Sequence, residues 1–424
     1  MRLRFAFGKS GLDLDLPDGF DYKLLEARSA SPLPDAVAAV HEALANPAAG
    51  PSLADVAAGK KTAAISVCDI TRPAPNRVVL PPLLDQLEKA GIPRQNVSIF
   101  IATGLHRPAT EAEIAEIVGP DVFGTVKVLN HNARNFEEHR HLGSTASGIP
   151  VYIDERFLNA DLHITLGFIE PHLMLGFSGG RKLIAPGLAA QETIKVIHSP
   201  KFMRDPRATE GSVEDNPLHR ELLEIARMAR HDFMIDVALT RDRRIAAVFA
   251  GEPEQAHAVG MKFVSKVMLE QLDGPVDAVI TSCAGYPLDL TFYQAIKGIT
   301  AAQHILRPGG RILLVAECAE GPGAHEFCEM LKQTASWEEF LDSIREAPVT
   351  VDQWQLEKLA LVAQKAEVLF YTPGLPAEFR GKLWGRAAAT PQEALAALTE
   401  GLRPGAAIAL MPEGPYVLAR AANV

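Results

Sequence analysis

Three histidines stand at positions where a chain can be expected to place reactive side chains. His106 follows an apolar run and a glycine turn in TGLHR, and His172 follows another apolar run in PHLMLG. His198 lies at or just past the end of a helical stretch in VIHSP. Histidine takes up and releases protons near neutral pH, and its imidazole nitrogen also binds metal ions. The residues alone make His106 and His172 candidate bases and His198 a possible metal ligand.

The densest polar stretch is the loop PHLMLGFSGGRKLIAPG at residues 171–187, which contains Lys182. Glycines let backbone N–H groups approach an anion, and a following helix N-terminus adds a favourable dipole. The loop therefore suits a phosphate, and a tight structural turn with solvated basic side chains is the alternative. The candidate nucleotide contacts in it are Ser178, Gly179, Gly180 and Arg181.

This loop departs from two common nucleotide-binding patterns. In a Walker A loop, Gly-Lys-Ser/Thr follows four variable residues, whereas here Arg181 replaces the second glycine and Leu183 the hydroxyl residue. A GxGxxG fingerprint after a strand is also missing. An ATPase and an ordinary Rossmann dehydrogenase are therefore disfavoured.

Two further motifs offer groups for an organic acid or a nucleotide. In CDITRP at residues 68–73, the guanidinium of Arg72 matches a carboxylate or phosphate, and Asp69 could hold that guanidinium or a ribose hydroxyl. In FYQAIKG at residues 292–298, helical spacing brings the side chains of Tyr293, Gln294 and Lys297 close together. An ordinary surface ion pair and a solvated helix face are the respective alternatives.

Other residues of metal-binding type have an ordinary interpretation. His131, His139 and His141 lie in a polar stretch whose HxH spacing is weak support for a metal site. None of the four cysteines belongs to a CxxC pair, so neither a disulfide framework nor a tetrathiolate zinc site is indicated. They are expected to be small buried residues: Cys68, Cys283, Cys318 and Cys328.

Short apolar runs that end in Gly-, Pro- or Asp-containing loops alternate with helical patterns. This alternation predicts an α/β fold with largely parallel sheets. In such sheets ligands gather at the carboxyl ends of the strands, where the polar residues above are found. The predicted strands include 63–67, 97–102, 162–166, 276–281, 312–315, 368–371 and 407–411. The predicted helices include 76–90, 217–229, 253–272, 336–344 and 415–422.

A chain of 424 residues is too long for one ordinary core, so two domains are expected. We place the first at residues 1–272 and the second at 273–411, because DGP at 273–275 opens a new series of strands. The last stretch, about 412–424, is expected to pack back on the first domain.

The composition is that of a globular protein, with 47% hydrophobic and 22% charged residues. The formal net charge of -10 and the lack of a clustered basic face disfavour a nucleic-acid partner. No segment approaches the length of about 20 apolar residues that a membrane helix needs. The N-terminal sequence alternates like a strand and lacks a signal-peptide core, so a cytoplasmic enzyme is expected.

Taken together, these motifs resemble lactate racemase and the wider family of nickel-pincer nucleotide enzymes. The matching pieces are CDITRP, TGLHR, PHLMLGFSGGRKLIAPG, VIHSP and FYQAIKG, which occur in this order across both expected domains. The resemblance implies a two-domain α/β fold with the active site in an inter-domain cleft. It also implies a racemase or epimerase that inverts C2 of a 2-hydroxy acid, lactate or a related acid, by proton-coupled hydride transfer.

The cofactor implied by the resemblance is a pyridinium-3,5-bisthiocarboxylic acid mononucleotide that carries nickel. By position it would be attached covalently at Lys182, with His198 as the protein ligand of nickel. His106 and His172 would be the two bases, one for each enantiomer. The nucleotide would be held by Asp69, Ile70, Thr71, Arg72 and the SGGR loop. The substrate would be held by Arg72, Tyr293, Gln294, Lys297 and Trp354.

The identity of the hydroxy acid and the oligomeric state are left open by the sequence. The implied partners are the proteins that make the cofactor and insert nickel. Two alternatives remain: a nucleotide- or metal-dependent enzyme of the same fold without pincer chemistry, and a non-enzymatic cofactor carrier.

Overall fold

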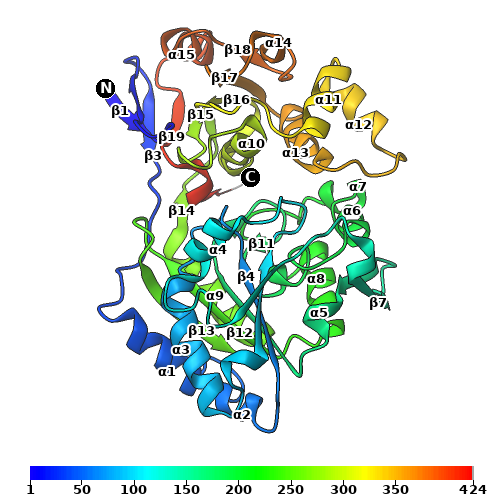
Figure 1. Ribbon diagram of the computed structural model, residues 1–424. Coiled ribbons are helices and arrows are strands. Elements are labelled where there is room, and N and C mark those ends of the chain that lie inside the picture. Colours follow the sequence, from blue (N-terminus) through cyan, green and yellow to red (C-terminus); the bar gives the residue numbers. More distant parts are fainter. Residues whose placement is uncertain (423–424) are drawn as a thin grey trace. The chain divides into compact units, whose positions relative to one another are not determined.

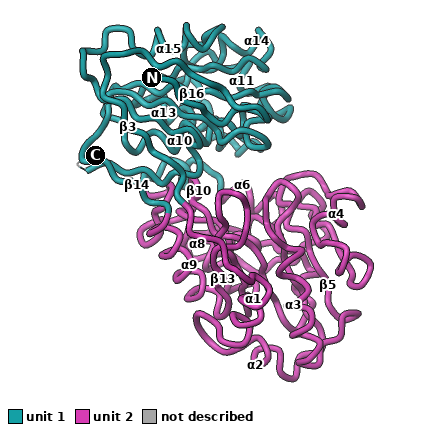
Figure 2. Tube along the Cα trace, turned by 90° about the vertical axis from the view of Figure 1, so that its left-hand side faces the viewer, with its two compact units in different colours: residues 1–28, 198–206, 268–424 teal, residues 29–197, 207–267 magenta. Residues whose placement is uncertain are grey.

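The computed structural model describes residues 1–422, and residues 423 and 424 lie outside the described residues. The chain forms two compact units, shown in order along the chain in Figure 1 and coloured separately in Figure 2. Unit 2 comprises residues 29–197 and 207–267, and unit 1 comprises residues 1–28, 198–206 and the chain from 268. Each unit is built around a six-stranded sheet, which confirms the predicted α/β class with two domains.

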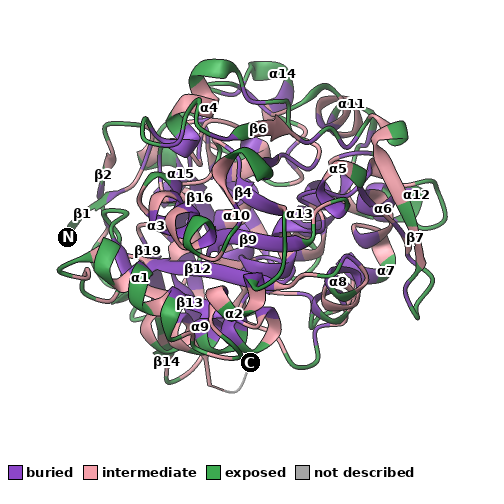
Figure 3. Ribbon diagram, turned by 60° about the horizontal axis from the view of Figure 1, so that its bottom comes forward, coloured by how far each residue is buried: buried purple, intermediate pink, exposed green. Residues whose placement is uncertain are grey.

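The central sheet of unit 2 has the strand order β13-β12-β9-β4-β5-β6. Its neighbouring strands are parallel except for the pair β12 and β13. Strands β4 and β9 are buried along their whole length, as expected for a parallel sheet covered on both faces, and they are purple in Figure 3. The strands are β4 (Ala63–Cys68), β5 (Val97–Ala102), β6 (Lys127–Asn130), β9 (Leu162–Phe168), β12 (Phe233–Leu239) and β13 (Ile245–Gly251).

Helix α3 (Asn76–Lys89) shows how the sequence pattern builds the core of unit 2. Its buried residues include Val79, Leu80, Leu83 and Leu87, which form one stripe at helical spacing in the main core of the unit. The helix ends before Gly91, whose φ of 96° favours glycine, and this confirms the predicted helix.

The other helices of unit 2 are α1 (Ala36–Ala45), α2 (Leu53–Ala57), α4 (Glu111–Val118), α5 (Glu155–Leu158), α6 (Gln191–Ile197), α8 (Pro217–Met228) and α9 (Pro253–Met268), whose last residue belongs to unit 1. Short strand pairs complete it: β7 (His139–Ser144) with β8 (Pro150–Asp154), and β10 (Pro171–His172) with β11 (Gly176–Phe177). The 3-10 turns are η1 (Arg94–Asn96), η2 (Phe136–Glu138) and η3 (Gly180–Leu183).

The central sheet of unit 1 has the order β18-β17-β16-β15-β19-β3, and all its neighbouring strands are parallel. The strands are β3 (Asp21–Leu24), β15 (Val276–Ser282), β16 (Leu306–Val315), β17 (Glu367–Tyr371), β18 (Arg386–Ala387) and β19 (Ala407–Met411). The helices are α7 (Pro200–Met203), α10 (Phe292–Ala302), α11 (His325–Gln333), α12 (Trp337–Ser343), α13 (Gln353–Ala363), α14 (Ala377–Arg380) and α15 (Pro391–Thr399). Smaller elements are β1 (Arg2–Phe5), β2 (Leu12–Asp15), β14 (Leu269–Leu272), β20 (Leu418–Ala421), η4 (Gln303–Ile305) and η5 (Gly414–Tyr416).

The sheet of unit 1 carries a separate apolar core on each face. Val279 belongs to the larger core, which includes residues of α10, α11 and α13. Its neighbours Ala278 and Ile280 belong to the smaller core, formed with the β1–β2 hairpin and α15. This alternation follows from the two-residue period of a strand. Phe292 packs on Phe370 in the larger core with ring centroids 5.5 Å apart, and this packing fixes the start of α10.

The chain crosses between the units at places that differ from the expected single boundary near residue 272. The N-terminal stretch belongs to unit 1 because β3 pairs with β19. Residues 198–206 also belong to unit 1, although they stand in the middle of the expected first domain. The stretch from 412 to 422 lies with residues 268–411 in unit 1 and is not grouped with unit 2. The assignment of these three stretches to unit 1 depends on contacts between segments far apart in sequence, which local patterns do not reveal.

One predicted helix is wrong at its end, and another is wrong over its whole length. The helix expected at 253–272 stops at Met268, and the next four residues form β14. The helix expected at 415–422 is η5 followed by β20, which pairs in parallel with β14. Each of these short segments obtains its backbone hydrogen bonds from the other, so neither sequence alone indicates a strand.

Candidate active site

Polar loops follow three neighbouring parallel strands of unit 2. Asp69 comes directly after β4, His106 follows β5, and His172 follows β9. Strand β4 lies between β5 and β9, so the chain leaves the centre of the sheet in both directions. The carboxyl ends of strands at such a switch point form the usual ligand crevice of an open α/β sheet. The topology therefore places these three residues at the edge where the sequence predicts chemistry.

Asp69 and His106 form a direct pair at this edge. The Nδ1–H of His106 donates to Oδ2 of Asp69 over 2.6 Å. The other carboxylate oxygen, Oδ1, accepts from the hydroxyl of Thr71 at 2.6 Å and from its backbone N–H at 3.2 Å. The side chain of Asp69 is 8% exposed and that of His106 is 44% exposed. The carboxylate is therefore fixed beneath an imidazole that reaches solvent.

The surroundings of Asp69 keep it ionised. Burial acts to raise its pKa, but the hydrogen bond and charge of His106, the charge of Arg72 and the hydrogen bond of Thr71 outweigh burial and lower the pKa. An ionised Asp69 holds the proton of His106 on Nδ1 and leaves Nε2 as the proton acceptor. The pair has the geometry of an oriented general base.

His172 is held in the opposite pattern. It lies in the β10–β11 hairpin, and its Nδ1 accepts the backbone N–H groups of Met174 and Leu175, each at 3.3 Å. An acceptor at Nδ1 places the proton of the neutral ring on Nε2. The Nε2 atom therefore carries a hydrogen in His172 and a lone pair in His106.

The polar groups of the SGGR loop form hydrogen bonds with neighbouring residues of unit 2. The hydroxyl of Ser178 donates to the carbonyl of Phe168 at 2.8 Å, and the N–H of Gly180 donates to Asp236 at 2.7 Å. Gly179 has a φ of 84°, and a Cβ there would come within 2.2 Å of the Asp236 carboxylate. A side chain at this position would be strained and would clash. The predicted contacts of this loop with a nucleotide stay a prediction.

Arg181 lies inside unit 2, where it is 2% exposed. One guanidinium nitrogen donates to the carbonyls of Leu175 and Phe177 at 3.0 and 3.1 Å, and the other lies 3.3 Å from Nδ1 of His257. Burial lowers the pKa of Arg181 to about 9. In this structure the guanidinium supports the loop from within, and its role as a nucleotide contact stays a prediction.

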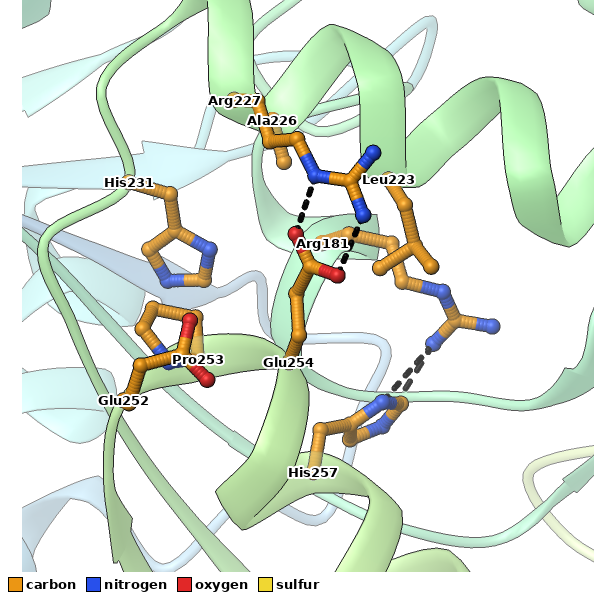
Figure 4. A pocket seen from close by; sticks show the side chains of 9 residues that line it. All are labelled: Arg181, Leu223, Ala226, Arg227, His231, Glu252, Pro253, Glu254 and His257. Carbon is orange, nitrogen blue, oxygen red and sulfur yellow. Dashed lines mark hydrogen bonds and ion pairs between the residues drawn. The ribbon is translucent and has the colours of Figure 1, made fainter. Parts of the chain in front are cut away.

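Figure 4 shows the small pocket beside this guanidinium, which has a volume of about 70 Å³. Arg181 and His257 point toward each other across it, and Arg227 and Glu254 close it with an ion pair. The pocket therefore lies among the residues that support the SGGR loop.

Lys182 follows on the same loop and is half-buried. Its backbone carbonyl accepts the N–H of Gly187 at 3.1 Å, and the hydroxyl of Ser66 on β4 donates to Leu183 O at 2.8 Å. Burial raises the pKa of the Cys68 thiol to about 12, with Asp69 and Asp236 acting to raise it and Arg72 and Lys182 to lower it. These charges all act at the carboxyl end of β4, where the sequence predicts the site.

Unit 1 brings a second group of predicted residues together. The ring of His198 lies against the ring of Trp354, with centroids 4.4 Å apart and planes at 36°. The indole Nε1–H of Trp354 donates to the hydroxyl oxygen of Tyr293 at 3.2 Å. Tyr293 stands on α10 and Trp354 on α13, two helices that share the larger core. These contacts make the three residues neighbours within unit 1.

Gln294 and Lys297 stand on the same helix as Tyr293. The amide oxygen Oε1 of Gln294 is buried and has no hydrogen-bond partner within the described residues. A buried amide oxygen without a partner is unfavourable, so this atom is suited to a ligand group. Burial raises the pKa of Cys283 to about 12, although the charge of Lys297 acts to lower it. The predicted acid-binding helix face is thus polar within an apolar surrounding.

Sequence reasoning missed Asp236 and missed the pairing of Asp69 with His106. Asp236 interrupts the apolar strand FMIDVAL and is fully buried. Burial raises its pKa to about 7, although Gly180 and Arg181 act to lower it. A lone acidic residue in an apolar strand was the available signal, because such a group needs specific partners.

The histidines of the HxH stretch contact neighbouring side chains of unit 2. His131 is buried against Asp154, with 3.4 Å between Nδ1 and Oδ2, and His141 stacks on Tyr152. Within residues 1–422, no group of three or more His, Cys, Asp or Glu side chains is placed to hold a metal ion. No helix among the described residues is long and apolar enough to cross a membrane.

Comparison with known proteins agrees with this arrangement. The family model described as lactate racemase N-terminal domain matches residues 7–211, and that described as lactate racemase C-terminal domain matches residues 272–419. Lactate racemase from Thermoanaerobacterium thermosaccharolyticum is 35% identical over 423 residues, which is 99% of each chain. Lactate racemase from Lactiplantibacillus plantarum is 33% identical over 385 residues, covering 90% of each chain.

Solved structures agree with the sequence comparison. The structure of the lactate racemase apoprotein from T. thermosaccharolyticum has a TM-score of 0.92 and 34% identity, covering 99% of this chain and 100% of that one. A protein from Thermotoga maritima shares the fold, with a TM-score of 0.68, 16% identity, and coverage of 93% of this chain and 100% of that one. The protein is therefore an isomerase of the racemase class. The chain belongs to the lactate racemase family.

Proposed function

We propose that this enzyme racemises a 2-hydroxy acid, lactate or a close relative, by proton-coupled hydride transfer with a nickel-pincer nucleotide. The observation that carries the proposal is the opposite hydrogen bonding of two histidines that follow strands on either side of β4. His106 presents a lone pair at Nε2, and His172 presents an N–H. Inversion at C2 through a planar keto acid needs a proton acceptor for each face, and a pair of histidines supplies both.

The residues fit the cofactor that the family resemblance implies. By the family resemblance the amine of Lys182 would carry the covalent attachment, and its charge acts at the end of β4. His198 offers an imidazole nitrogen, which is a suitable nickel ligand. When bound, the cofactor would supply a reversible acceptor for the C2 hydride. The nucleotide would be held by the Asp69-Ile70-Thr71-Arg72 turn and by the SGGR loop.

The two bases do different work in this proposal. His106 takes the hydroxyl proton of one enantiomer at Nε2, and the ionised Asp69 stabilises the imidazolium that forms. His172 takes the hydroxyl proton of the other enantiomer. To do so, its Nε2 must first lose its proton. If that proton moves to Nδ1, this nitrogen can no longer accept the backbone N–H groups of Met174 and Leu175. His106 needs no such change, because its Nε2 already carries a lone pair.

The substrate is oriented by groups that suit a carboxylate and a keto oxygen. Arg72 and Lys297 supply charge, and Gln294 supplies an amide whose oxygen has no partner within the described residues. Tyr293 and Trp354 shape the apolar side of the pocket. Arg72 belongs to unit 2, and the other four residues belong to unit 1.

The decisive experiment uses holoenzyme matured with the proteins that make the cofactor and insert nickel. Each enantiomer of a panel of 2-hydroxy acids is incubated with the enzyme, and chiral chromatography follows the appearance of the other enantiomer. We expect inversion of at least one short acid, and an intact mass increased by the cofactor only when Lys182 is present. Cofactor attachment without inversion across the panel would identify a carrier, and a mass without adduct would indicate an enzyme without pincer chemistry.

A further inference from the structure

The segment of residues 198–206 depends on other parts of unit 1 for its conformation. It contains His198 and α7, a helix of only four residues. So short a helix is unstable by itself, because the cost of nucleation exceeds the gain from its few hydrogen bonds. Phe202 and Met203 are buried, which holds the segment against the core. Apolar burial is non-directional, however, and does not fix the position of a neighbouring imidazole.

Arg204 makes two directed contacts at the end of this segment. Its Nε–H donates to Oε1 of Glu357 at 2.7 Å, and its NH2 group donates to the carbonyl of Leu341 at 2.7 Å. Leu341 lies in the last turn of α12, which has no basic residue of its own there. A cation at this position satisfies a terminal carbonyl and interacts favourably with the helix dipole.

Glu357 and Lys358 of α13 both contact the end of this segment. The side chain of Glu357 is 0% exposed, and burial raises its pKa although the hydrogen bond and charge of Arg204 act to lower it. The Nζ of Lys358 donates to the carbonyl of Met203 at 3.0 Å, in the last turn of α7. We call Arg204, Glu357 and Lys358 the clamp.

Two clamp residues, Glu357 and Lys358, lie with Trp354 on one face of α13. Trp354, Glu357 and Lys358 stand at i, i+3 and i+4, so their side chains are neighbours. Trp354 contacts His198, the first residue of the segment, and the other two contact its far end. One rigid helix face therefore holds the segment at both ends.

We propose that Arg204, Glu357 and Lys358 are positioning residues that fix the imidazole of His198 against Trp354 and thereby slow the loss of nickel. The metal part of this inference rests on the proposed function, in which His198 is a nickel ligand. The positioning part concerns only the described residues of unit 1. The two parts can therefore be tested separately.

The first measurement is hydrogen exchange of the full-length chain without cofactor. Arg204→Met removes both directed contacts and leaves a buried carboxylate without its partner. We expect amides of residues 200–206 to exchange about tenfold faster, while β4 and β5 of unit 2 keep their protection. Arg204→Lys keeps the charge but loses the planar fork, and an intermediate increase is expected.

Arg311→Met is the matched control. Arg311 also pairs with a glutamate, Glu367, at 3.0 Å and donates to a carbonyl in the last turn of a helix, that of Leu398 in α15. It belongs to unit 1 and has no contact with the 198–206 segment in the described structure. We expect it to leave exchange in residues 200–206 unchanged.

The second measurement is the rate at which matured holoenzyme loses nickel during dialysis against a chelator, followed by elemental analysis. Arg204→Met is expected to lose nickel about tenfold faster than wild type and Arg311→Met. His198→Ala serves as the reference for complete loss of the ligand. The covalent adduct, measured by intact mass, is expected to remain in all of them.

Each outcome decides one part. Unchanged exchange at residues 200–206 in Arg204→Met would overturn the clamp. Faster exchange with wild-type nickel retention, in a protein whose His198→Ala variant loses nickel, would overturn the link between clamp and metal while leaving the proposed function intact. Nickel retention by His198→Ala would overturn the ligand assignment in the proposed function, and the exchange measurement would still decide whether the clamp holds the segment.

Discussion

In unit 2 the candidate residues lie on loops that follow β4, β5 and β9, whereas in unit 1 most of them lie on the helices α10 and α13. The loops of unit 2 are supported by buried polar groups, among them Asp69, Asp236 and Arg181. Helix α10 of unit 1 is supported by apolar packing, with the ring of Phe292 near those of Phe327 and Phe370, whereas α13 also carries the buried Glu357 and Lys358 of the clamp. Residues proposed to move protons and anchor the cofactor thus rest on a charged network, and those of α10 proposed to bind the acid rest on an apolar core.

This difference has a physical reason. Proton carriers need neighbours that set their tautomers, and only charged or hydrogen-bonding groups can do so. A site that orients an acid gains from a low-dielectric surrounding, where each polar contact is stronger. Changes in unit 2 should therefore act on chemistry and pH behaviour, and changes in unit 1 on substrate affinity or metal retention.

The largest effects are expected from the two bases of unit 2. His106→Ala and His172→Ala should each reduce racemisation by about 10² to 10⁴-fold, the usual contribution of a general base. The cofactor should stay attached, because Lys182 lies in η3, outside the β10–β11 hairpin and the loop that follows β5, and intact mass checks this. His141→Ala, which removes a ring stacked on Tyr152, is the control and should retain turnover. Near-normal turnover of either base variant would refute the two-base assignment.

The next effect is expected from His198 in unit 1. His198→Ala should lower the nickel content of matured enzyme by about 10- to 100-fold under chelation, since an imidazole ligand is lost. Elemental analysis beside intact mass separates loss of metal from loss of cofactor. Trp354→Phe keeps an aromatic ring beside residue 198 and serves as the comparison. Equal nickel content in His198→Ala and wild type would remove His198 from the metal site.

Much of the fold could be predicted from the sequence because most strands are continuous apolar runs between turn residues. β5 and β19 occupy the expected residues, and α3 differs by one. The failures occurred at β14 and β20, which pair with each other across the chain. The assignment of residues 1–28 and 198–206 to unit 1 likewise depends on distant contacts with β19 and α13. Local patterns carry no information on such partners.

The candidate site could be predicted from its motifs more readily than from its interactions. Asp69, His106 and His172 were visible as polar residues that follow apolar runs. The sequence proposed a guanidinium or a ribose hydroxyl as the partner of Asp69 and a nucleotide as the partner of Arg181, and these contacts stay predictions. In the structure Asp69 orients His106, and Arg181 bonds to carbonyls of its own loop. A side chain's type shows what it can bind, but only the fold decides which partner is within reach.

Acid is expected to destabilise unit 2 through its buried histidines. Burial lowers the pKa of His219 to about 3 and that of His257 well below its ordinary value. The unfolded chain takes up protons below about pH 6.5, whereas these folded rings do not, so their stabilising contribution is complete above that pH and falls as the pH drops. Each ring should cost about 2 kcal/mol of unfolding free energy between pH 6.5 and 5.

Asp236 acts in the opposite direction over this range. Its pKa is raised to about 7, so the folded state holds the proton that the unfolded state releases above about pH 4, and this contribution grows as the pH falls from 7. Hydrogen exchange of β9 and β12 at pH 7 and pH 5 measures the sum. We expect lower protection at pH 5, and a larger loss in Asp236→Asn, which lacks the opposing contribution. Equal protection at both pH values would contradict the histidine account.

The smallest effect is expected at the acid-binding face of unit 1. Gln294→Leu replaces a buried amide oxygen that has no partner in the described structure with an apolar group of similar size. Loss of one hydrogen bond to the bound acid should reduce kcat/KM by about tenfold, mainly through KM, because the contact orients ground state and transition state alike. Removal of the unsatisfied oxygen should leave thermal stability equal or slightly higher. A fall in kcat at unchanged KM would show that Gln294 acts in the chemical step and would break the division of labour between the two units.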